Sequence, residues 1–108
     1  MMLKYGLRSS NLEEAAGDIG QLLKIVFKPH SSAYRGGDYF RAEVPEGTVY
    51  LQCNFDPMDN EPFELTWPPD QLLLCFDGLA DEQWFRRTEL LGPLVQGETA
   101  VFLKRGIS

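Results

Sequence analysis

The chain has 108 residues, a formal net charge of −6, an apolar content of 44% and an aromatic content of 12%. This composition is typical of one globular domain with its own core, and it excludes a disordered chain and a molecule with separate cofactor and substrate domains. No apolar stretch approaches the roughly 18 residues of a membrane span, and the first residues lack the apolar segment of a signal peptide, so the sequence predicts a cytoplasmic protein.

The N-terminal quarter predicts one strand followed by one helix. Apolar and other residues alternate over residues 3–7, which is the period of a half-buried strand. Ser10 and Glu13 then have the spacing of a capping box, and apolar residues recur at helical spacing over residues 12–26. Because a proline follows closely, we expect this helix to end by about Phe27.

The middle of the chain predicts neighbouring antiparallel strands. Residues 39–44 and 49–55 both alternate, and the short turn Pro45-Glu46-Gly47 joins them, with Phe55 expected on the same face as Val49. Residues 72–76 are continuously apolar, which indicates a strand covered on both faces. We therefore expect this strand to lie centrally in the sheet.

The last third predicts a second helix and a final strand. Asp81 can cap this helix, and Gly92-Pro93 closes it. Its buried side would comprise Trp84, Phe85, Thr88 and Leu91. Residues 99–103 are β-branched or apolar and predict the last strand. Together these elements predict an α+β fold, in which residues 1–108 form a single domain with a mixed or mainly antiparallel sheet of about five to six strands and two helices packed on it.

The acidic residues are concentrated in the middle of the chain. Between Arg41 and Arg86 there is no Lys or Arg, and the remaining residues together sum to +4. This middle segment contains ten acids: Glu43, Glu46, Asp56, Asp59, Glu61, Glu64, Asp70, Asp77, Asp81 and Glu82. Two interpretations stand: an ordinary solvated acidic face, or a docking surface that repels nucleic acid and anionic membranes and steers a basic protein.

The loop over residues 56–70 is the strongest candidate for a binding element. It contains four prolines and five acids and has no regular period. Loops of this length tend to bind partners, and prolines reduce the entropy that such a loop loses on docking. Its large apolar side chains include Met58, Phe63 and Trp67. They could serve as interface anchors, or Phe63 and Trp67 could fold back as a lid on the core.

The sequence contains no motif that indicates a catalytic, metal or cofactor site. The only histidine, His30, lies in no motif that locates a nucleophile, so we expect no enzyme. The acids lack the spacing and the glycine of a calcium loop, and one histidine with two separated cysteines does not supply the ligand set of a zinc site. We expect Cys53 and Cys75 to be buried thiols rather than a disulfide, and we expect no metal and no cofactor.

Three segments resemble a known class of small bacterial proteins. They are residues 31–41 (SSAYRGGDYFR), residues 51–56 (LQCNFD) and Glu61-Pro62. They are similar to immunity proteins of contact-dependent growth inhibition systems, in which a short cytosolic protein binds and blocks the toxic C-terminal domain of a secreted effector, often a nuclease. The resemblance implies a small non-enzymatic inhibitor of a toxin domain. The acidic charge indicates that this partner is basic and predicts no direct contact with nucleic acid or membrane.

The predicted partner-binding residues form two groups. The loop supplies Asp56, Asp59, Glu61, Phe63, Glu64 and Trp67, and the preceding turn supplies Tyr34, Arg35, Asp38 and Tyr39. A nuclease presents a cationic groove to phosphates, so carboxylates placed there would compete with its substrate. Two alternatives stay open: a small regulatory or adaptor domain that binds another protein or a small ligand, and a hydrolase that uses His30.

Overall fold

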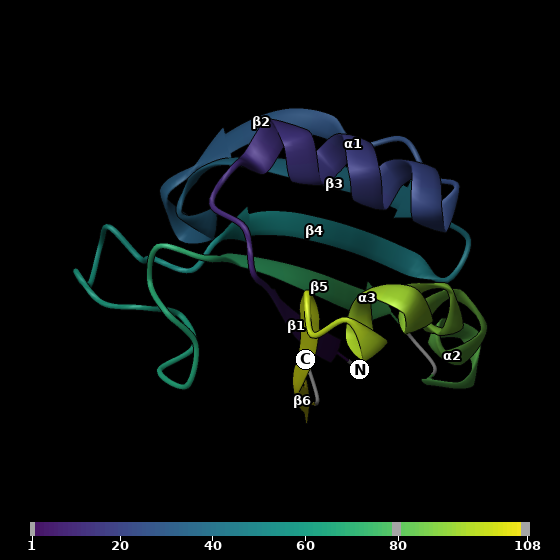
Figure 1. Ribbon diagram of the computed structural model, residues 1–108. Helices are drawn as coiled ribbons and strands as arrows, with labels where there is room; N and C mark the ends of the chain where they lie inside the picture. The colour runs from purple at the N-terminus through teal and green to yellow at the C-terminus, as the bar shows by residue number, and fades with distance from the viewer. Residues whose placement is uncertain (1, 79–80, 107–108) are drawn as a thin grey trace.

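A six-stranded sheet with strand order β2-β3-β4-β5-β1-β6 forms the centre of the molecule (Figure 1), and its neighbouring strands are antiparallel. The computed structural model describes residues 2–78 and 81–106. The elements in chain order are β1 (Met2–Leu7), α1 (Leu12–Leu23), β2 (Lys28–Ser32), the 3₁₀ turn η1 (Ala33–Arg35), β3 (Gly37–Val44), β4 (Gly47–Cys53), β5 (Leu72–Gly78), α2 (Asp81–Thr88), the 3₁₀ turn η2 (Glu89–Leu91), α3 (Gly92–Gln96) and β6 (Ala100–Gly106). The predicted α+β fold is confirmed.

Helix α1 covers one face of the sheet, and its ends differ from the prediction. Asn11, not Ser10, is the N-cap, because its side chain accepts a hydrogen bond from the Glu14 N–H (3.0 Å). The helix ends at Leu23 rather than near Phe27, because Lys24 adopts a left-handed conformation (φ 57°) that turns the chain out of the helix. The shorter helix leaves residues available for a further strand.

Strand β2 was not predicted. Its residues, Lys-Pro-His-Ser-Ser, are mostly exposed and show no apolar alternation, because the strand lies at the edge of the sheet. It pairs with β3 in the register Lys28↔Arg41 to Ser32↔Gly37. A proline is tolerated there because an edge strand need not donate every backbone hydrogen bond.

The central strands follow the predicted pattern. Residues 72–76 of β5 are buried, and β5 lies between β4 and β1. Ala42 of β3 and Val49 and Leu51 of β4 point into the core beneath α1. The second face of β5 is also covered, since Leu73 and Cys75 belong to a separate apolar cluster on the other side of the sheet. The central placement of this strand is therefore confirmed.

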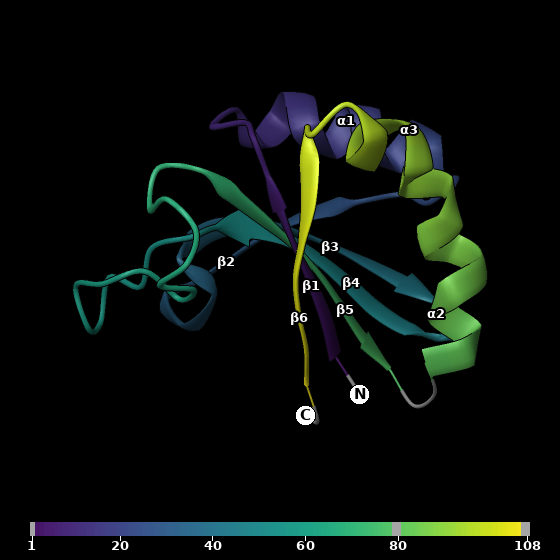
Figure 2. The same cartoon turned by 60° about the horizontal axis from the view of Figure 1, so that its bottom comes forward.

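Helix α2 packs against the same core as α1 (Figure 2), but the segment after it continues as helix. Trp84 is fully buried, and its ring lies 5.1 Å from that of Phe76. Gly92-Pro93 was predicted to close the second helix, but α2 ends earlier, at Thr88, and these two residues begin α3. A proline fits the first turn of a helix because its missing N–H leaves no hydrogen bond unmade there. The side chains of Asp81 and Phe85 lie outside the described part of the structure.

Candidate functional site

The loop between β4 and β5 is fixed by one buried side chain, Asn54. Its Nδ2 donates to the carbonyl oxygens of Glu64 (3.0 Å), Trp67 (2.7 Å) and Pro68 (3.2 Å), and its Oδ1 accepts from the Glu64 N–H (2.8 Å). Asn54 is fully buried. The second half of the loop is therefore held against the end of β4 rather than free to move.

Trp67 folds back onto the sheet instead of facing solvent. Its side chain packs with Leu73 and Cys75 on the face opposite α1 and α2, and only 7% of it is exposed. The contact requires Gly6 in β1, because a Cβ at that position would lie 2.3 Å from the indole Cε2. Phe63 packs partly against the same cluster. Trp67 therefore forms a lid on the core and is not an exposed interface anchor.

Glu64 also faces inward. Its carboxylate accepts from Lys4 Nζ at 2.8 Å and lies 3.2 Å from Lys104 Nζ. Burial alone would raise the pKa of this carboxyl, but the hydrogen bonds and charges of the two lysines outweigh it and lower the pKa below its ordinary value of 4.5. The charge of Glu64 is thus neutralised within the molecule, and Glu64 and Trp67 are left out of the candidate surface.

Residues 56–61, which we call the tip, project from one end of the sheet (Figure 1). The backbone N–H groups of Asp56 and Glu61 each donate to the carbonyl of the other residue, at 2.7 and 3.3 Å. Within this turn the Met58 N–H donates to Asp56 Oδ1 (2.9 Å), and Asn60 adopts a left-handed conformation. Met58 is 59% exposed, and Asp59 and Glu61 are exposed. The tip is an ordered turn that presents an apolar side chain between carboxylates.

The turn that carries Tyr34 lies beside the base of this loop. Gly36 has a positive φ (83°), and a Cβ there would lie 2.9 Å from the Phe55 carbonyl oxygen and 3.4 Å from the Phe63 ring. Tyr34 is 77% exposed, and Phe55, predicted as a buried strand residue, is 37% exposed because β4 ends at Cys53. The two loops meet at the same end of the sheet (Figure 2).

The remaining predicted turn residues lie elsewhere. The Arg35 guanidinium stacks 3.6 Å above the Tyr50 ring centroid and donates to Gln52 Oε1, so it lies on the sheet face opposite the helices. Tyr39 is buried on that face, with its ring stacked on that of His30. Asp38 is exposed and lines a hollow beside the start of α1. Of this second group, Tyr34 is the exposed residue on the turn that lies beside the base of the loop.

The ten acids of the middle segment do not form one surface. Glu43 pairs with Arg41, and Glu46 pairs with Arg87 (2.6 Å), at the far end of the β3–β4 hairpin. The hydrogen bond from Arg87 lowers the pKa of Glu46. The side chains of Asp81 and Glu82 lie outside the described residues. Of the other five, Asp56, Asp59 and Glu61 lie in the tip, Asp70 is exposed later in the same loop, and Asp77 is half-buried in β5.

Comparison with known proteins finds no protein-family model, no curated protein and no solved structure that matches this chain. Within residues 2–78 and 81–106, no three His, Cys, Asp or Glu side chains form a group that could hold a metal ion. None of the described helices is long and apolar enough to cross a bilayer. Cys53 and Cys75 are free thiols, and burial raises the pKa of Cys75 to about 11, so it is not poised as a nucleophile.

Proposed function

We propose that this protein is an immunity protein that binds and neutralises a basic toxin domain, such as a nuclease, through the tip and the adjacent Tyr34. The observation that carries the proposal is the ordered, projecting turn that places Met58 between the carboxylates of Asp56, Asp59 and Glu61. Exposed apolar side chains with a charged rim are typical of protein-binding surfaces.

The charge of the tip supports a basic partner. Among the described residues, no lysine or arginine pairs with the carboxylates of Asp56, Asp59 or Glu61. Unpaired carboxylates on a projecting turn attract a cationic surface over a distance and accelerate encounter. A nuclease must present such a surface to the phosphates of its substrate, so occupation by the tip would exclude the nucleic acid.

The shape of the tip supports tight rather than transient binding. Met58, Tyr34 and Phe55 supply exposed apolar area at one end of the sheet. The hydrogen bonds of Asn54 and the closed turn already hold the loop in one conformation. Little conformational entropy is then lost on docking, and more of the contact energy remains as affinity.

The function is tested by co-expression with the toxin domains encoded beside the gene. We expect one of them to co-purify with this protein as a stable complex and to lose its toxicity to the cells that express it. Failure of every neighbouring candidate to bind would remove the support for an immunity function. A stable complex with undiminished toxicity would favour the alternative of an adaptor domain.

The role of the tip is tested by association kinetics at several salt concentrations. Asp59→Lys with Glu61→Lys should slow association at low salt by roughly tenfold or more and flatten its salt dependence. A matched control, Asp18→Lys with Glu89→Lys, changes the net charge equally at exposed acids of α1 and η2. Its association rate should stay within about twofold of the unmodified protein. Equal rates for the two variants would show that the tip is not the contact.

A further inference from the structure

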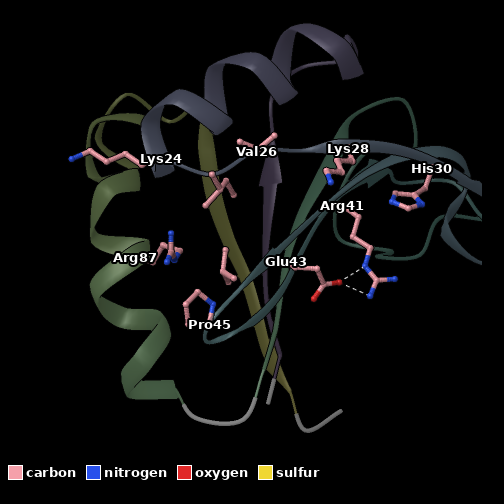
Figure 3. Close-up of a pocket in the computed structure, with 10 residues that line it drawn as sticks. Lys24, Val26, Lys28, His30, Arg41, Glu43, Pro45 and Arg87 are labelled. Atoms are coloured by element: carbon pink, nitrogen blue, oxygen red, sulfur yellow. Dashed lines mark hydrogen bonds and ion pairs between the residues drawn. The ribbon is translucent and has the colours of Figure 1, made fainter.

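A cavity of about 590 Å³ lies between the end of α1, the strands β2 and β3, and α2 (Figure 3). It exists because the β2–β3 ladder ends at the pair Lys28↔Arg41, whereas β3 continues to Val44. The connection after Leu23, the last residue of α1, passes beside the end of β3 that β2 does not reach. The volume falls within the range of roughly 300–1,000 Å³ that small-molecule sites occupy.

The side chains around this cavity carry an excess of positive charge. Four cations line it, Lys24, Lys28, Arg41 and Arg87, together with one acid, Glu43. Lys28 and Arg41 lie on adjacent strands on one side, Arg87 lies across the cavity on α2, and the Lys24 side chain points outward from the end of α1 (Figure 3). The cluster is therefore cationic on both sides.

Two of these four charges are already balanced. Arg41 Nε donates to Glu43 Oε1 (2.6 Å), and Arg87 pairs with Glu46. Within the part of the chain that the structure describes, neither Lys24 nor Lys28 forms an ion pair. Subtracting Glu43 and Glu46 from the four cations leaves a local charge of +2.

We propose that this cavity binds a small phosphate monoester, with its phosphate between Lys28 and Arg41 and its organic part against the aliphatic wall of Val26 and Pro45. A phosphate monoester carries a charge of about −1.5 to −2 at pH 7, which is opposite in sign to the local excess. Guanidinium and ammonium donors are the usual partners of such a group. A nucleic acid polymer is disfavoured, since the molecule as a whole is acidic.

The proposal is tested by two-dimensional NMR of the intact protein, titrated at constant ionic strength with inorganic phosphate and with butyl phosphate. The backbone amides of residues 24–28 and 42–44 should shift and saturate, with a dissociation constant for inorganic phosphate in the roughly millimolar range. Butyl phosphate should bind at least about fivefold more tightly, because its alkyl chain contacts the aliphatic wall. Shifts that do not saturate, or equal affinity for both probes, would overturn the proposal.

Variants locate the phosphate. Lys28→Gln, at an exposed position that leaves the fold intact, should weaken binding of butyl phosphate about tenfold. Lys28→Gln with Arg41→Gln should remove the saturable shifts. The matched control is Lys104→Gln on β6, at the opposite edge of the sheet, and it should leave the affinity unchanged. If Lys28→Gln and Lys104→Gln have the same effect, the cavity is not the binding site.

Discussion

Asn54 shows how much of the candidate surface depends on one side chain. Its amide replaces the hydrogen bonds that a strand partner would have supplied to residues 64–68. The sequence places Asn54 in the alternating pattern of β4 but gives no sign that it is buried, because its partners are ten or more residues away. Such a residue is recognised only once the loop is seen to return to it.

We expect Asn54→Asp to destabilise the protein more than Asn54→Ala. Alanine leaves the Glu64 N–H and the carbonyls without partners, which should cost about 2–3 kcal/mol. Aspartate can still accept from that N–H, but its carboxylate cannot donate and faces three carbonyl oxygens. Urea unfolding measures which of the two variants is less stable. Hydrogen exchange of residues 56–67 reports whether the loop becomes disordered. If Asn54→Asp were as stable as the unmodified protein, this account would be contradicted.

At the scale of elements, the loop of residues 54–71 behaves as a cover for the sheet face that no helix protects. Trp67 fits there because Gly6 leaves room beneath it, so the cover and β1 are matched in shape. The matching residues are far apart in the chain. This explains why the sequence could identify the loop but could not decide between a lid and an exposed anchor for Trp67.

A double-mutant cycle tests this match. Trp67→Ala should cost about 3 kcal/mol through the cavity that it leaves, and Gly6→Ala about 1–3 kcal/mol through collision with the indole. The double variant should be less destabilised than the sum of the two, because the new methyl group enters space that the indole has vacated. Urea unfolding of the four proteins measures the coupling. Strict additivity would mean that the two side chains do not share this space.

The strands and helices were predicted correctly where neighbouring residues in the sequence specify them. The β3–β4 hairpin and the buried β5 were correct because alternation, a short turn and a continuous apolar run specify them directly. Strand β2 was missed because an exposed edge strand carries no apolar pattern. The end of α1 was misplaced because apolar residues continue past Leu23, although there they serve the crossing to β2 rather than the helix.

At the scale of the whole molecule, two glutamates form three ion pairs that join distant parts of the chain. Glu64 links the loop to Lys4 in β1 and Lys104 in β6, and Glu46 links the β3–β4 turn to Arg87 in α2. Two of the acids concentrated in the middle of the sequence therefore serve to join elements within the molecule. Which acids stay free could not be predicted, because their cationic partners come from both ends of the chain.

These ion pairs predict how the stability of the protein changes as the pH falls. The pKa values of Glu46 and Glu64 are lowered in the folded protein, so their contribution to stability is present above the unfolded value of about 4.5. It is lost as the pH falls through the lowered values. Glu46→Gln with Glu64→Gln should flatten this loss below pH 4.5, as measured by urea unfolding at a series of pH values, whereas Glu13→Gln at an exposed site should not. An equally steep loss in all three proteins would contradict the assignment.

The position of β1 between β5 and β6 constrains the order in which the molecule can be assembled. Strands β2 to β5 pair with their neighbours in sequence, so they can form as a meander through short loop closures. β1 finds its two partners only in residues 72–78 and 100–106, across more than sixty residues of chain. Contacts of such separation slow folding, and the N-terminal strand of a growing chain must wait unpaired until β5 has been synthesised. Strand β1 is thus among the last strands to gain its partners.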